Sequence, residues 1–200
     1  MRYLSIDLET TGLDPQNSQI LEFGAVLEDT NNILPMDELP YYHAYIVPEK
    51  GIITGHIYAL NMNASIIEKI NNKNTLQEKY NFIELGDLTE SFLFWLSSQG
   101  FKTNKIDGES INVSEYLNIA GKNFNGFDKL FLNNVPLWNK HIKMRHRVID
   151  PAVLFVDWKN DGALPDLSKC KEKAGLDSVV SHLAIDDAKD VIRLLRKSYV

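Results

Sequence analysis

The first half of the chain alternates short apolar runs with polar turns. Apolar runs of strand length predict three strands, over residues 2–7, 20–27 and 41–47. The sequence TGLDP at residues 11–15 separates the first two, and its Gly and Pro are strong turn signals. Strands that follow one another in this way predict an antiparallel meander.

The second half mixes helical spacing with short strands. Among its helices, residues 125–132 are expected to turn Phe127, Leu130 and Phe131 toward the core. The other predicted helices cover residues 64–70, 88–96 after an Asp87 cap, 151–156 and 184–195, and the predicted strands cover 117–120 and 148–150. Early strands followed by alternating strands and helices predict an α/β layer protein with a mixed sheet.

No repeat, low-complexity tract or Gly/Ser linker divides the 200 residues. We therefore expect one domain over residues 1–200, with a polar surface insertion at about residues 100–115. The single cysteine, Cys170, excludes an internal disulfide and any cysteine-built metal site. No apolar stretch approaches the length of a membrane span, and the start MRYLSID is unlike a signal peptide. These features predict a reducing, cytoplasmic compartment and no membrane partner.

The formal net charge of −6 argues against a protein that holds nucleic acid through a broad basic surface. It does not exclude nucleic acid as a substrate, because bound divalent cations can supply positive charge locally. The one basic stretch, residues 139–147, has two interpretations. It either guides a phosphate backbone toward a site or is a solvated face of an acidic protein.

Two carboxylates, Asp7 and Glu9, interrupt the first apolar run. Residues i and i+2 of a strand face the same side, so both side chains are expected to project from one face. They lie at the carboxyl end of the strand, where ligand sites of α/β sheets gather. Taken alone, this pair is more typical of solvated acids at a strand terminus than of a ligand site.

Two later segments add acids and a histidine. Asp128, in NFNGFDKLFL, lies at the border of an otherwise apolar helix face. In SHLAIDDAKD, His182 precedes Asp187 by five positions, which on one helix would turn the two side chains about 140° apart. They can converge if His182 lies in the loop before the helix and Asp187 lies early within it, as the apolar stripe from Ala184 indicates.

Four carboxylates that meet would be severely destabilising unless they are protonated or bound to cations. Two unit charges about 4 Å apart repel by about 4 kcal/mol at an effective dielectric constant of about 20. Oxygen ligands without cysteine suit Mg²⁺ or Mn²⁺, and two such ions can activate a water and stabilise the leaving oxygen of a phosphodiester. A histidine, which titrates near neutral pH, can accept the proton of that water.

The motifs Asp7-x-Glu9-Thr10-Thr11-Gly12-Leu13, Asn123…Phe127-Asp128 and His182-x₄-Asp187 resemble those of the DEDDh 3′–5′ exonucleases. This superfamily includes proofreading exonucleases, ribonuclease T and oligoribonuclease. The resemblance implies a ribonuclease-H-like fold, a central mixed sheet flanked by helices. It also implies two divalent metal ions, Mg²⁺ or Mn²⁺, held by the acids Asp7, Glu9, Asp128 and Asp187.

The resemblance further assigns His182 as general base and three residues to substrate. The backbone around Thr10 would meet the terminal 3′-hydroxyl, Leu13 would pack against the last base, and Asn123 would lie near the scissile phosphate. The five-residue spacing favours Asp187 over its neighbour Asp186, and we interpret Asp150 as structural.

The sequence therefore predicts a metal-dependent 3′–5′ exonuclease that releases nucleoside 5′-monophosphates from single-stranded DNA or RNA 3′ ends. A homodimer is left open by the resemblance. One alternative is another metal-dependent phosphodiesterase, such as an endonuclease, built on the same acids. The other is a catalytically silent nucleic-acid-binding module.

Overall fold

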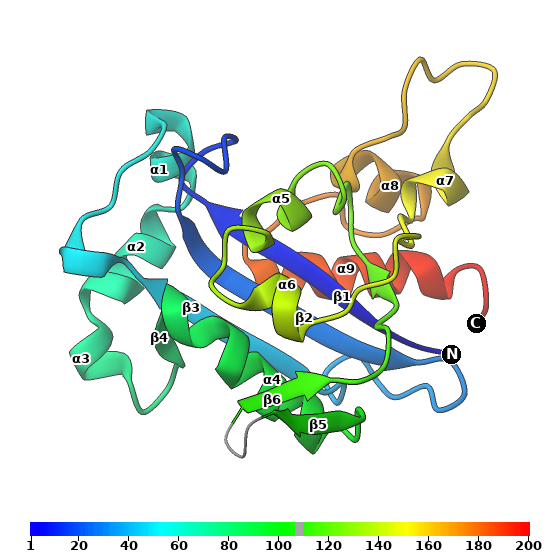
Figure 1. Ribbon diagram of the computed structural model, residues 1–200. Coiled ribbons are helices and arrows are strands. Elements are labelled where there is room, and N and C mark those ends of the chain that lie inside the picture. The colour runs from blue at the N-terminus through cyan, green and yellow to red at the C-terminus, as the bar shows by residue number, and fades with distance from the viewer. Residues whose placement is uncertain (107–109) are drawn as a thin grey trace.

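A mixed five-stranded sheet forms the centre of the computed structural model, which describes residues 1–106 and 110–200 (Figure 1). Its strand order is β4-β3-β2-β1-β7. The strands are β1 (Arg2–Thr10), β2 (Ile20–Asp29), β3 (Tyr41–Val47), β4 (Phe82–Glu84) and β7 (Ile119–Ala120). The first three pair antiparallel, whereas β4 is parallel to β3 and β7 is parallel to β1. The predicted meander and the mixed sheet are confirmed.

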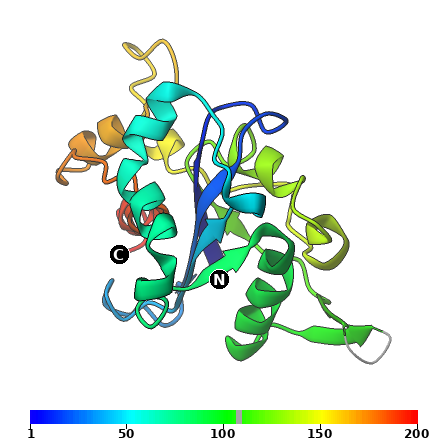
Figure 2. The ribbon, with the colours of Figure 1, turned by 90° about the vertical axis from the view of Figure 1, so that its left-hand side faces the viewer.

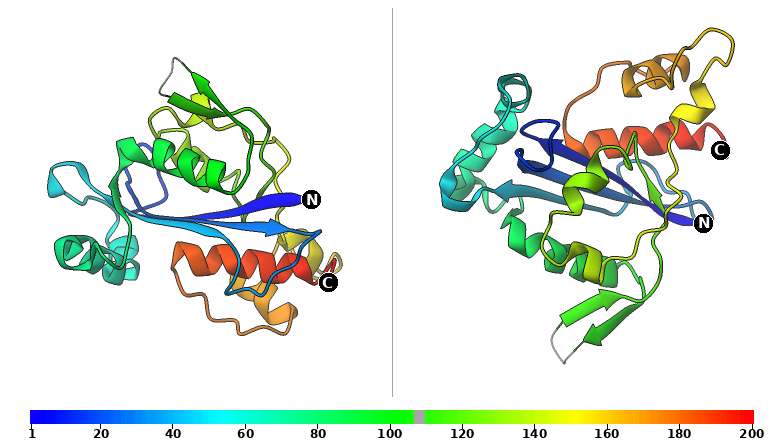
Figure 3. Two further views of the ribbon diagram at one scale, coloured as in Figure 1. Left: turned by 90° about the horizontal axis from the view of Figure 1, so that it is seen from below. Right: turned by 45° about the horizontal axis from the view of Figure 1, so that its top comes forward.

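Helices cover both faces of this sheet, with α9 on one side and α4 on the other (Figure 3). The helices α1 to α3 follow one another in the part of the molecule that faces the viewer in Figure 2, and α2 packs against β2 and β3. The α-helices are α1 (Ile57–Met62), α2 (Ala64–Asn71), α3 (Lys73–Leu76), α4 (Leu88–Ser98), α5 (Asp128–Leu132), α6 (Trp138–His141), α7 (Ala152–Phe155), α8 (Leu167–Lys173) and α9 (Ala184–Arg196). Short 3₁₀ turns at Glu49–Gly51 and Leu85–Asp87 connect elements around them.

The two faces of the sheet bury different cores. On the α4 face, Phe23, Phe92 and Trp138 pack edge-on or stacked with ring centroids 5.1–5.8 Å apart. On the α9 face, the apolar stripe of the last helix packs against Tyr3 and Val26. Burial of that stripe, which consists of Ala184, Ala188, Val191 and Leu195, confirms the helix that its spacing predicts.

The helix expected over residues 125–132 begins later than predicted, at Asp128. Asn123 adopts a left-handed backbone, and hydrogen-bonded turns occupy the next residues up to Phe127. This later start changes the face that α5 presents to the core. Phe131 is buried, but Leu130 is 43% exposed, so its predicted core position is wrong.

Other boundaries also differ from the sequence pattern. The first strand continues through Thr10, so Glu9 lies within it. Residues 148–150 contribute only a bridge from Ile149 to Ala120, because the segment touches the sheet edge at that one pair. The expected insertion at about residues 100–115 contains the strands β5 (Thr103–Ile106) and β6 (Ser110–Val113), and its residues 107–109 lie outside the described part. In the described part of the chain, no helix has the length and apolar character needed to cross a membrane.

Candidate active site

Strand β1 carries Asp7 and Glu9 side by side on the face that α9 covers. In the antiparallel register Asp7 lies opposite Gly24 and Glu9 lies opposite Glu22. Tyr3, which has the same parity along the strand, packs against α9 and so identifies the face. The two acids therefore project toward the start of α9, as the i, i+2 spacing predicts.

Asp128, in the first turn of α5, extends its side chain to strand β1 between Asp7 and Glu9. Its Oδ1 accepts a hydrogen bond of 3.0 Å from the backbone N–H of Leu8, the residue between Asp7 and Glu9. The side chain is 2% exposed, so Asp128 is not the surface acid that its sequence context alone would suggest. This single contact joins two segments that lie 120 positions apart.

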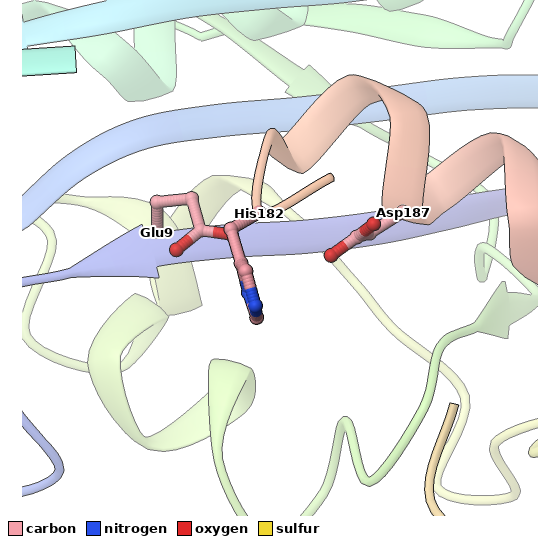
Figure 4. A group of neighbouring side chains, drawn as sticks. All are labelled: Glu9, His182 and Asp187. Atoms are coloured by element: carbon pink, nitrogen blue, oxygen red, sulfur yellow. The ribbon is translucent and has the colours of Figure 1, made fainter. Parts of the chain in front are cut away.

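The start of α9 supplies Asp187 and His182. His182 lies in the loop before the helix, where its backbone has a left-handed φ of 52°. Asp187 is buried in the first turn, and the Ser181 hydroxyl donates to it at 3.4 Å. Side-chain ligand atoms of Glu9, His182 and Asp187 all lie within 4.8 Å of one another (Figure 4). The convergence of His182 and Asp187 through a loop before the helix is confirmed.

Burial, and for Asp7 and Glu9 also the neighbouring carboxylates, raise the pKa values of the acids. Burial raises the pKa of Glu9 to about 8, and the carboxylates of Asp187 and Glu22 add to the shift. Burial likewise raises the pKa of Asp128 to about 7 and that of Asp187 to about 6. The pKa of Asp7 lies well above its usual range, first through loss of hydration and then through the charges of Asp128, Asp187, Glu9 and Glu22.

This donor set fits a divalent cation. Carboxylate oxygens and one imidazole nitrogen are ligands that Mg²⁺ and Mn²⁺ accept. The raised pKa values show that negative charge accumulates here, and Lys171 offsets it only in part, at Asp187. Asp7, Glu9, Asp128 and Asp187 could therefore hold metal ions. His182 is the exposed member of the group with Glu9 and Asp187, and Asp7 and Asp128 lie outside that group of three but beside it.

We expect the metal-free protein to lose stability as the pH rises from 5 to 8. The folded carboxylates bind protons more tightly than unfolded ones, whose pKa values are about 4, so the folded state releases its protons only at higher pH. A loss of about 2 kcal/mol would lower the Tm by about 4–8 °C for a chain of this size. Thermal unfolding in EDTA at each pH measures this drop.

Saturating Mn²⁺ should raise the Tm strongly at pH 8 and little at pH 5, because protons and metal compete for the same oxygens. A Tm in EDTA that stays level or increases over this pH range would contradict the charge repulsion inferred here.

A cleft of about 740 Å³ opens beside Glu9. Leu13, at its rim, is 84% exposed, and the Thr10 hydroxyl donates to the carbonyl of Gly12 inside the turn. The remaining wall comes largely from the turn at residues 12–18, the start of α1 and Phe127. The predicted substrate residues Thr10 and Leu13 thus line one apolar cleft next to the carboxylates.

Asn123 is exposed and precedes α5 in the chain, and it is not among the residues that line the cleft. Asp150 accepts hydrogen bonds from the backbone N–H groups of Asn123 and Ala152, which agrees with its structural interpretation. Asp186 lies in the first turn of α9 and outside the group formed by Glu9, His182 and Asp187.

Sequence reasoning missed three residues around the site. Glu22 is fully buried opposite Glu9, although an acid within the apolar run ILEFGAV is the same signal that singled out Asp7. The buried Asn63 amide donates to the carbonyl of Thr10 at 3.0 Å and counteracts the raised pKa of Glu9. His56 lines the cleft at the start of α1. No local sequence signal marks Asn63 or His56.

Comparisons with known proteins agree with this geometry. Residues 4–86 match the family model RNase_T, described as exonuclease. No curated protein matches the chain by sequence. The nuclease domain of 3′hExo, a DEDDh family member solved with rAMP, superimposes with a TM-score of 0.61 at 16% identity, over 98% of this chain and 90% of that one.

Two longer proteins share the fold over 98% of this chain. Cell-death related nuclease 4 (CRN-4) gives a TM-score of 0.62 at 16% identity, and this chain spans 62% of its length. Exonuclease I from E. coli, solved with the oligonucleotide dT13, gives a TM-score of 0.62 at 14% identity, and this chain spans 40% of its length. The chain therefore shares the ribonuclease-H-like fold of these nucleases, and the matched exonuclease region agrees with the predicted resemblance to the DEDDh 3′–5′ exonucleases.

Proposed function

We propose that the chain is a metal-dependent 3′–5′ exonuclease that removes nucleoside 5′-monophosphates from single-stranded nucleic acid. The observation that carries this proposal is the meeting of Asp7, Glu9, Asp128 and Asp187, with His182, beside an apolar cleft. The matched exonuclease region and the nuclease folds support it. The dT13 oligonucleotide bound to exonuclease I supports a single-stranded substrate, and the rAMP bound to 3′hExo supports release of a nucleoside monophosphate.

Divalent cations bound by the four acids would acidify a water and offset the charge of the phosphate. The chain itself supplies orientation and a proton acceptor. Leu13 and the cleft wall would hold the terminal base, which brings its 5′-phosphate to the carboxylates. The imidazole of His182 lies in one group with Glu9 and Asp187 and is open to solvent, so it is the proposed proton acceptor.

The reaction that follows is a hydrolysis. The water oxygen forms a bond to phosphorus, and the bond from phosphorus to the 3′ oxygen of the preceding nucleotide breaks. His182 accepts the proton of the water, and the leaving 3′ oxygen takes a proton from solvent. The products are a nucleoside 5′-monophosphate and a chain that is one nucleotide shorter.

Digestion of a 5′-labelled single-stranded oligonucleotide in Mn²⁺ tests this function. We expect a ladder of labelled products that shorten by one nucleotide at a time, and no cleavage in EDTA. Matched DNA and RNA strands of several lengths establish the preferred sugar and length in the same experiment. Internal fragments as first products would favour an endonuclease, and an intact substrate in Mn²⁺ would favour a silent binding module.

A further inference from the structure

Glu22 is a buried carboxylate that the proposed reaction does not use. It lies on β2 opposite Glu9 and is completely inaccessible to solvent. Its Oε2 accepts a 3.0 Å hydrogen bond from the backbone N–H of Ala184, the first residue of α9. Its Oε1 lies 2.5 Å from Nε2 of His43 on β3. Both oxygens of Glu22 are therefore engaged, one by the helix start and one by the neighbouring strand.

Gly24, two residues further along β2, lets the same helix start approach the sheet. A Cβ at this position would lie only 2.6–2.8 Å from backbone atoms of Ala184 and Ile185. Such contacts are far inside van der Waals distance, and the atoms concerned are backbone that cannot rotate away. Any side chain at position 24 would push the start of α9 off the sheet.

Glu22 and Gly24 together fix the position of Ala184 at the start of α9, and this position determines where His182 and Asp187 lie. Ala184 lies two residues after His182 and three before Asp187. A carboxylate at the N-terminus of a 13-residue helix is also favoured by the helix dipole. A shift of Ala184 would move the histidine and the carboxylate together, and the loop before α9 already holds His182 in a left-handed conformation.

We propose that Glu22 is a positioning residue for His182 and Asp187. In this proposal Glu22 and Gly24 fix the start of α9 against the sheet, and His43 holds the carboxylate of Glu22 in place. The proposal rests on the function proposed above, since it assigns Glu22 to that same site. Residues that hydrogen-bond around a metal site typically change metal affinity or activity by about 10–100-fold when they are altered. Glu22 acts through the helix start, without touching substrate.

Glu28 provides a matched control within the same strand and on the same face. It too is completely buried, and it binds the opposite end of α9 through Arg196, with an N–O distance of 2.7 Å. Tyr199 adds a hydrogen bond of 3.2 Å to Glu28. Shortening either glutamate to aspartate removes one methylene and withdraws the carboxylate from α9. Only the end of α9 that Glu22 contacts lies next to His182 and Asp187.

The experiment compares Glu22→Asp, Glu22→Gln and Glu28→Asp with the wild type. For Glu22→Asp we expect kcat on a single-stranded oligonucleotide and the Mn²⁺ affinity from calorimetry to fall by about 10–100-fold, with KM unchanged. Glu22→Gln keeps the reach to Ala184 and should recover most of both losses. Glu28→Asp should lower the Tm but leave kcat and Mn²⁺ affinity at wild-type values.

Equal effects of Glu22→Asp and Glu28→Asp on kcat and Mn²⁺ affinity would overturn the proposal, because they would reflect general loosening of α9. Wild-type kcat in Glu22→Asp would overturn it as well. Should the wild type show no nuclease activity, the exonuclease proposal fails. The Mn²⁺ affinities of the same three variants still decide whether Glu22 positions Asp187.

Discussion

We expect the largest effect from replacement of Asp7 by Asn, which should abolish cleavage of the oligonucleotide while the protein stays folded. Asp7 is the acid whose pKa is raised by all four neighbouring carboxylates, so it lies at the electrostatic centre of the site. An amide keeps the shape but supplies no charge to a divalent cation. We expect kcat to fall by at least about 10⁴-fold, beyond the range of about 10²–10⁴ that is typical of a lost general base.

The same substitution should stabilise the metal-free protein at pH 8, because it removes one charge from a repelling group. Thermal unfolding in EDTA therefore distinguishes a lost site from a lost fold. Asp186→Asn is the matched control, since Asp186 lies in the first turn of α9 beside Asp187 but is not among the four carboxylates that raise the pKa of Asp7. It should retain activity. Cleavage by Asp7→Asn at the wild-type rate would show that the site is assigned wrongly.

Replacement of His182 by Ala should lower kcat by about 10²–10⁴-fold, the usual contribution of a general base. The ring lies within 4.8 Å of carboxylate oxygens of Glu9 and Asp187 but is exposed, so it can exchange its proton with solvent. Its loss removes a proton acceptor and leaves the four acids in place. We therefore expect KM to change little and Mn²⁺ still to raise the Tm at pH 8.

His146→Ala is the control for this variant, because His146 is an exposed histidine of the basic stretch at residues 139–147. Steady-state kinetics of both variants on one oligonucleotide make the comparison. A His182→Ala enzyme with wild-type kcat would exclude the ring as proton acceptor. Loss of the Mn²⁺-induced increase in Tm would instead assign the ring to metal binding.

The acids of the site could be predicted because each breaks an apolar pattern. Asp7 and Glu9 interrupt a strand, and the five-residue interval from His182 to Asp187 is compatible with one site only if a loop precedes the helix. The structure confirms both placements. Strand alternation and helical spacing are local properties, so a single sequence is enough to read them.

The role of Asn63 and the start of α5 could not be predicted, because both depend on contacts between segments that are distant in the sequence. The buried Asn63 side chain meets Thr10 only because the loop after β3 folds back over the TGLDP turn, where Gly55 lies against Thr11. The start of α5 depends on the left-handed backbone of Asn123, whose N–H is held by Asp150. Spacing along the chain encodes neither feature.

Two tryptophans differ sharply in exposure. Trp138 is completely buried in the core on the α4 face, whereas Trp158 is 81% exposed in the loop after α7. Burial excludes Trp138 from any contact with nucleic acid.

Diffraction from crystals soaked in Mn²⁺ tests the central claim most directly, since the claim is that buried acids from three separate segments meet in order to bind catalytic cations. We predict anomalous density between the carboxylates of Asp7, Glu9, Asp128 and Asp187. Anomalous peaks found only elsewhere, or no peak in this group at pH 8, would contradict the account.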